Sequence, residues 1–153
     1  MKANQHIKAA LLHACRNAIE QRITVAEQAM LDAQQSANSE EKSSAGDKYE
    51  TGRAMSQIER DRCAKQLAEA RQELTRLNKI DSNIEYARAS AGALVVCDQN
   101  TYFIAAAIGA VTVDGQTILV ISPASPLAQQ LAGKQVNDCI RFNERQFCIK
   151  EIV

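Results

Sequence analysis

The chain has 153 residues, which is enough for one ordinary domain or two small parts. Its 18 basic and 18 acidic side chains balance, and this disfavours direct electrostatic binding to nucleic acid. The N-terminal residues lack the apolar core of a signal peptide, and the longest apolar run, 103–113, is too short to cross a bilayer. The sequence therefore predicts a cytoplasmic protein that does not contact a membrane.

Residues 1–81 have the apolar spacing of helices and contain no proline. The apolar positions recur every three or four residues in two series: Leu12, Cys15, Ile19, Ile23, Ala26, Met30, Ala33 and Ala37, then Cys63, Leu67, Ala70, Leu74 and Leu77. This stripe is narrow and rich in alanine, so it suits burial against a single partner helix. We predict an antiparallel helical hairpin, or coiled coil, over residues 1–81 with its tip near residues 40–50.

Residues 82–153 change to the two-residue period of strands. We expect a strand near 92–98, one longer strand over 99–113 with a bend at Gly109, and a return strand after the turn residues Asp114 and Gly115. A short helix is predicted to begin at Ser125 and Pro126, and a final hairpin covers 138–153. The sequence predicts an α+β domain at 82–153, in which one short helix packs on a small antiparallel sheet.

The cysteines at positions 15, 63, 97, 139 and 148 form no C-x-x-C pair, and we interpret them as buried thiols in a reducing compartment. A disulfide across the final hairpin, between Cys139 and Cys148, remains an alternative. His6 and His13 share a helical face, but no acid or cysteine is placed to act with them as a metal ligand or catalytic partner. We therefore expect no metal or catalytic role for them.

The string ISPASPLAQQLAGKQVND, 121–138, resembles the C-terminal signature of the Gre-type bacterial transcript cleavage factors. The matching residues are Ile121, Ser122, Ser125, Pro126, Leu127, Gly133, Lys134, Val136 and Asp138. The predicted plan of a helical hairpin followed by a small sheet domain also agrees with this family. The resemblance implies an FKBP-like fold for the second domain.

The same resemblance implies a monomeric transcription elongation factor that binds bacterial RNA polymerase and meets nucleic acid only through that complex. Polymerase docking is implied for Ser122, Ser125 and Pro126. The hairpin tip would enter the secondary channel, where acidic residues share a Mg²⁺ ion with the polymerase active site. The resemblance further implies that the factor has no catalytic activity or metal of its own and promotes hydrolysis of backtracked RNA by the polymerase.

The family's tip pattern, Gly-Asp followed two residues later by Glu, matches Gly46, Asp47 and Glu50. Carboxylate oxygens are suitable ligands for Mg²⁺ and can complete a two-metal site. Glu40 and Glu41 are the substitutes if they lie at the apex. The same Asp-x-x-Glu spacing is also a capping box at a helix start, so Asp47 and Glu50 have a purely structural interpretation as well.

The tip departs from the family pattern after Glu50, where Gly52 and Arg53 follow Thr51, and the nearby bases Lys42 and Lys48 reduce its negative charge. A Gre-like modulator or inhibitor that does not promote cleavage is therefore an alternative. A coiled-coil adaptor without polymerase contact is a second. A prolyl isomerase, in which Tyr102, Phe103, Phe142 and Phe147 supply aromatic groups, is a third.

Overall fold

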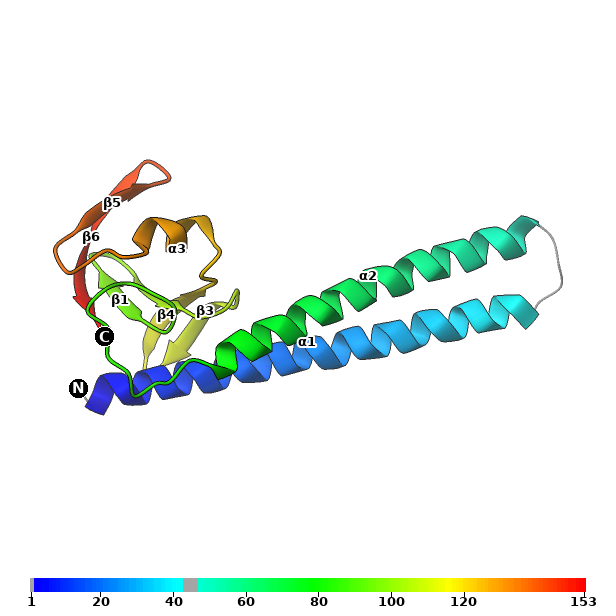
Figure 1. Ribbon diagram of the computed structural model, residues 1–153, viewed down its shortest axis with the longest axis horizontal. Helices are drawn as coiled ribbons and strands as arrows, with labels where there is room; N and C mark the ends of the chain where they lie inside the picture. The colour runs from blue at the N-terminus through cyan, green and yellow to red at the C-terminus, as the bar shows by residue number, and fades with distance from the viewer. Residues whose placement is uncertain (1, 43–46) are drawn as a thin grey trace. The chain divides into compact units, whose positions relative to one another are not determined.

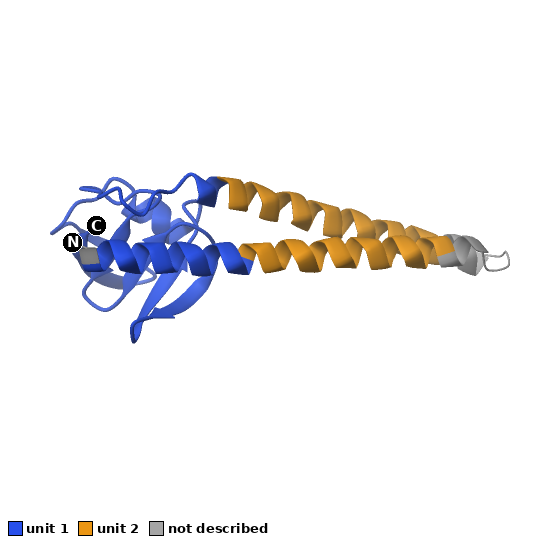
Figure 2. Cartoon of the chain, turned by 90° about the horizontal axis from the view of Figure 1, so that it is seen from below, with its two compact units in different colours: residues 1–18, 76–153 blue, residues 19–75 orange. Residues whose placement is uncertain are grey.

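The computed structural model describes the backbone of residues 2–42 and 47–153 and the side chains of residues 3–38 and 52–153. It contains two long helices followed by a six-stranded sheet and one short helix, which confirms the α+β class (Figure 1). The chain divides into two compact units, Met1–Ala18 with Arg76–Val153, and Ile19–Thr75 (Figure 2). The predicted domain boundary between residues 81 and 82 stays a prediction.

The helical unit is an antiparallel pair, as the apolar spacing predicted. It is formed by α1 (Lys2–Lys42) and α2 (Asp47–Asn78) within Ile19–Thr75. The buried apolar residues of this unit are Ile19, Ala26, Ala33, Ala37, Cys63, Leu67 and Ala70. Arg22 pairs with Glu73 at 3.6 Å, and Arg71 pairs with Glu27 at 2.9 Å, so charged side chains join the two helices beside the apolar stripe. These partly exposed pairs are consistent with the antiparallel register and add little to its stability.

The sheet has the strand order β3-β4-β2-β1-β6-β5. The strands are β1 (Leu94–Cys97), β2 (Thr101–Ile104), β3 (Gly109–Val113), β4 (Gln116–Ile121), β5 (Cys139–Phe142) and β6 (Arg145–Ile152). Strands β2 and β4 pair in parallel, whereas the other neighbouring pairs are antiparallel. The sheet is therefore mixed, and the prediction of a wholly antiparallel sheet is wrong at this one pair.

The parallel pair arises because the predicted long strand over 99–113 is two strands. Strand β2 ends at Ile104, and β3 begins at Gly109, whose φ of 95° favours glycine. Between them, Ala105 donates its N–H to the carbonyl of Ile121 at 2.9 Å, so the chain leaves the line of β2. The β3–β4 hairpin then places β4 beside β2. Its turn residues Asp114 and Gly115 both have positive φ, as predicted for a two-residue hairpin turn.

The sheet buries both of its faces within its unit. One face carries a core cluster together with α3 (Pro126–Leu131): Val95, Cys97, Tyr102, Ile104, Ala128, Leu131, Ile140 and Ile149. Strand alternation places a second set of buried residues on the opposite face: Leu94, Phe103, Ile118 and Val120. The first turns of α1, with buried Leu11 and Cys15, belong to the same unit. Full burial of a side chain such as Phe103, Leu131 or Ile118 stabilises the fold by roughly 1.5–3 kcal/mol.

A lysine lies in this core. Lys8 of α1 is 0% exposed, and its ammonium donates to the carbonyl of Ile84 at 2.8 Å and to that of Val153 at 3.0 Å. The same nitrogen lies 4.9 Å from the ring centroid of Tyr86, a cation–π distance. Burial lowers the pKa of Lys8 below its ordinary value of 10.5. Lys8 thereby fastens the first helix to the last residues of its unit.

Candidate functional site

The predicted docking residues lie in a tight turn that leads into α3. The hydroxyl of Ser125 donates to the carbonyl of Ser122 at 2.7 Å and accepts from the N–H of Ala128 at 3.2 Å. The hydroxyl of Ser122 accepts from the N–H of Ala124 at 3.2 Å. Ser125 is thus the N-cap that the sequence predicted, and Pro126 opens the helix. The structure brings Ser122, Ser125 and Pro126 together; their docking role stays a prediction.

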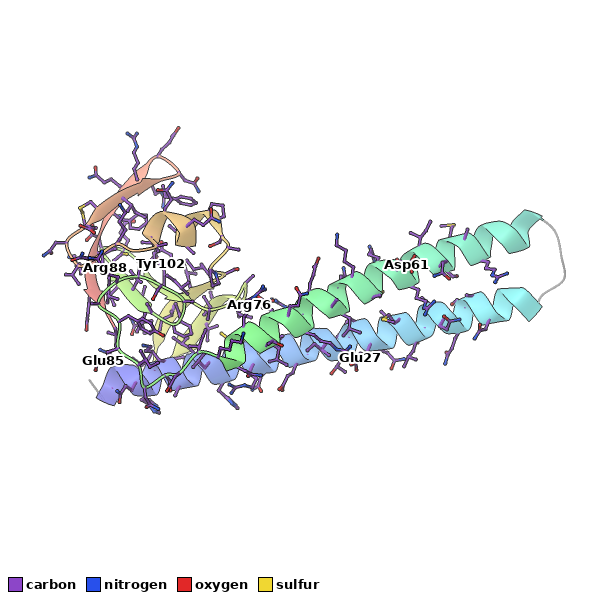
Figure 3. The ribbon with its side chains drawn as sticks, viewed as in Figure 1. Glu27, Asp61, Arg76, Glu85, Arg88 and Tyr102 are labelled. Carbon is purple, nitrogen blue, oxygen red and sulfur yellow. A yellow bond between two sulfur atoms is a disulfide. The ribbon has the colours of Figure 1, made fainter. Side chains whose placement is uncertain are left out.

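The rest of the signature string closes the segment after α3. Gly133, with a φ of 78°, donates its N–H to the carbonyl of Ala89, and the N–H of Ala89 donates to the carbonyl of Lys134, each at 2.9 Å. The guanidinium of Arg88, labelled in Figure 3, donates to the carbonyl of Gly133 at 3.1 Å. The carboxylate of Asp138 accepts from the N–H of Gln135 at 2.8 Å. These residues therefore hold the loop against the segment before β1.

A cavity of about 970 Å³ lies beside this turn, and the sequence did not reveal it. It is lined by Cys97, Gln99, Asn100, Tyr102, Gly109, Leu119, Val120, Ile121, Leu127, Phe142, Asn143, Arg145, Gln146 and Phe147. Ile121 and Leu127, which line it, lie before and after the turn of residues 122–126 in the chain. The cavity combines apolar and aromatic groups with amide and guanidinium groups, a composition typical of binding sites.

Three of the four aromatic residues considered for an isomerase pocket line the cavity: Tyr102, Phe142 and Phe147. The rings of Tyr102 and Phe147 lie 6.1 Å apart between centroids. Phe103 is 0% exposed and lies on the opposite face of the sheet, because the two faces alternate along β2. The sequence signal closest to this cavity was the set of aromatic residues considered for an isomerase, which did not predict its position. The isomerase alternative stays untested.

The cysteines fall into two groups. Cys139 and Cys148 are joined by a disulfide across β5 and β6, where they are direct register partners, so the hairpin alternative is the one observed. Cys15, Cys63 and Cys97 are buried and lie outside this disulfide. Burial, helped by the neighbouring Asp98, raises the pKa of Cys97 to about 11, so this thiol at the cavity wall is not a nucleophile near neutral pH.

The predicted tip acids are not placed by the structure. The side chains of Asp47 and Glu50, and those of the substitutes Glu40 and Glu41, lie outside the described residues. Within the described part of the chain, no group of three or more His, Cys, Asp or Glu residues is arranged to hold a metal ion. Any metal role for these four acids rests on the sequence pattern.

The cap of α3 gives a direct stability test. Ser125→Ala removes a hydroxyl that makes two hydrogen bonds, to Ser122 and Ala128, and we expect the free energy of unfolding to fall by about 1 kcal/mol. Ser125→Asp keeps an oxygen acceptor for the helix N–H and should lose less. Urea denaturation of both variants measures the difference, and equal losses would contradict the capping geometry.

Comparison with known proteins finds similarity among solved structures. No family model matches the chain, and no curated protein matches it. Among solved structures, the chain is similar to one titled "Structure of the transcription factor Gfh1", at 17% identity over 90% of this chain and 92% of that chain, with a TM-score of 0.38. A likeness at this level carries no argument about activity. No helix in the described ranges is apolar and long enough to span a bilayer.

Proposed function

We propose that the chain is a Gre-like transcription elongation factor that binds bacterial RNA polymerase. In this role the unit formed by Met1–Ala18 and Arg76–Val153 docks on the polymerase, and the helical hairpin carries acidic residues into the secondary channel. The factor has no hydrolytic activity of its own; it assists the polymerase in cleaving backtracked RNA. Nucleic acid is reached only through the polymerase complex.

The signature segment from Ile121 to Asp138 is the observation that carries the proposal. Within this segment, the hydroxyls of Ser122 and Ser125 form hydrogen bonds that shape the turn before α3. Gly133 and Asp138 form hydrogen bonds in the loop that follows α3. Pro126 and Ala124 are exposed in that turn, next to a cavity whose lining includes Leu127. An exposed turn beside a cavity lined by both apolar and polar groups is suited to a protein partner.

The tip residues supply the chemical part of the proposal. Asp47 and Glu50 would offer carboxylate oxygens to a Mg²⁺ ion that is shared with the polymerase, with Glu40 and Glu41 as substitutes. Hard oxygen donors fit Mg²⁺, which keeps several water ligands and can accept one or two protein carboxylates. A metal ion held by these carboxylates would supply an activated water and would stabilise the negative charge that develops in the polymerase reaction.

A substitution at the cavity tests polymerase docking. We expect Leu127→Lys to weaken binding to RNA polymerase by about tenfold or more, because it places an ammonium group in an apolar contact. Val136→Lys is the matched control, since Val136 belongs to the same signature string, is 42% exposed and does not line the cavity. Co-purification with bacterial RNA polymerase and a binding titration measure the affinity of both variants and of the wild type for the polymerase. Equal binding by Leu127→Lys and the wild type would contradict docking at this cavity, and failure of the wild type to bind would contradict the proposed function.

The coiled-coil adaptor is a second candidate, because the helical unit exposes four large apolar side chains: Val25, Leu31, Met55 and Ile58. An adaptor would cover such residues with another helix. Sedimentation of the full chain, with and without RNA polymerase, separates the two candidates. A self-associating adaptor sediments as an oligomer and does not bind the polymerase. The elongation factor sediments as a monomer and co-sediments with the polymerase.

A further inference from the structure

The outer part of the final hairpin is a two-stranded ribbon that leaves the sheet. Strand β6 pairs with β1 through Ile149, Glu151 and Ile152, whereas its residues from Arg145 to Cys148 pair with β5 alone. A two-stranded ribbon is only marginally stable by itself in water. The disulfide between Cys139 and Cys148 joins the strands of this ribbon at its base.

The ribbon supplies one wall of the cavity. Phe142, Asn143, Arg145, Gln146 and Phe147 all lie on it and all line the cavity. Phe147 is the only one of these with a ring partner on the neighbouring wall among the described residues, the ring of Tyr102. The order of the ribbon therefore sets the shape of the cavity.

The two disulfide cysteines are more accessible to small thiols than the other cysteines of the chain. Cys139 is exposed and Cys148 is half-buried, whereas the other three cysteines are buried. Access to a disulfide sulfur is a condition for thiol–disulfide exchange. Two hydrogen bonds also hold the base of the ribbon and do not involve the sulfur atoms. The N–H of Cys148 donates to the carboxylate of Asp98 at 3.1 Å, and the N–H of Ile149 donates to the carbonyl of Asp138 at 2.9 Å.

We propose that Cys139 and Cys148 form a reversible thiol–disulfide modification site that controls the order of the ribbon and, through it, the wall of the cavity. The oxidant is a small-molecule disulfide such as glutathione disulfide. One cysteine thiolate attacks it and releases one small thiol, and the second cysteine then attacks the mixed disulfide and releases the other. Two protein thiols and one small-molecule disulfide become one protein disulfide and two small thiols. The proposal does not depend on binding to RNA polymerase.

The test uses the purified full chain in its reduced form and after incubation with excess glutathione disulfide. We expect oxidation to remove two alkylatable thiols under native conditions and an excess of glutathione to restore them. Amide hydrogen exchange over residues 140–147 should be faster in the reduced form, on the order of 30-fold, because closing a short loop restricts the opened ribbon. The β3–β4 hairpin, which contains no cysteine, is the internal control and should exchange equally in both forms.

Two variants complete the design. Cys139→Ser with Cys148→Ser should exchange like the reduced wild type under both conditions, and Cys97→Ala should keep the full redox difference. The comparison of the two wild-type forms does not depend on how well either variant folds. The proposal is wrong if the reduced chain loses no thiols, if glutathione does not reopen the bond, or if the ribbon exchanges at the same rate in both forms.

Discussion

The double substitution Asp47→Asn with Glu50→Gln is expected to abolish stimulated shortening of backtracked RNA while binding to RNA polymerase stays unchanged. The loss should be on the order of 100-fold or more, because charge stabilisation by a correctly held metal ion contributes several kcal/mol to a transition state. The measurement is the rate of RNA shortening in stalled polymerase complexes with Mg²⁺ present. Wild-type rates in the double variant would show that these two acids are not the metal ligands.

The choice of amides separates the two interpretations of the tip. Asparagine caps a helix as well as aspartate, and glutamine serves in a capping box as glutamate does, so the double variant keeps the capping groups while it removes both charges. Glu40→Gln with Glu41→Gln is the matched control and should keep most of the activity. Loss in this second pair alone would assign the metal to Glu40 and Glu41. A wild-type chain that binds polymerase but never shortens RNA would instead be the non-cleaving modulator.

Lys8→Ala should lower the free energy of unfolding by about 3 kcal/mol, the largest stability effect that we expect from one substitution. The change removes a buried aliphatic stem and the donor that the carbonyls of Ile84 and Val153 share, although the Val153 carbonyl keeps the N–H of Leu94. Lys8→Met is the matched control, since it keeps most of the stem and loses only the ammonium. It should cost about 1–2 kcal/mol. Chemical denaturation measures both, and a loss in Lys8→Ala no larger than in an exposed lysine would contradict the packing.

The lowered pKa of Lys8 also predicts a pH dependence of stability. Burial lowers the pKa in the folded state, with Glu85 and Asp81 opposing the change, so between that pKa and the ordinary 10.5 the unfolded chain binds more protons than the folded chain. The free energy of unfolding attributable to Lys8 should therefore rise with pH across this window and level off above it. The difference between wild type and Lys8→Met isolates this effect, since the other groups cancel. A difference that falls with rising pH would contradict the assignment.

Local patterns predicted most of the secondary structure. The spacing of Ala26 and Ala33 indicated the buried stripe, Ser125 and Pro126 indicated the start of α3, and Asp114 with Gly115 indicated a hairpin turn, because each depends on neighbouring residues only. The parallel pairing of β2 with β4 was missed. The connection between β2 and β3 is rich in alanine and contains no turn residue before Gly109. Nothing in its sequence therefore indicated that the strand ends at Ile104.

Features that depend on contacts between residues far apart in the chain could not be predicted from the sequence. A lysine on a helix is normally exposed to solvent, so nothing in the sequence indicated that Lys8 is buried. Its burial depends on carbonyls that lie 76 and 145 residues further along the chain. The cavity forms only when the final hairpin, α3 and the sheet come together. The candidate site was therefore predictable as a turn and a motif, but its concave surface was not.

The unit that contains the sheet is discontinuous in sequence, and this has a consequence for how the hairpin can vary. Its two segments, Met1–Ala18 and Arg76–Val153, are joined across the break by Arg16, whose guanidinium donates to the side-chain oxygen of Asn78 at 3.1 Å. Residues 19–75 are thus an insertion between two adjacent points. Gain or loss of matched helical turns within that insertion changes the length of the helical pair while the sheet keeps the neighbours of its own unit, so evolution or protein engineering can alter the two units separately.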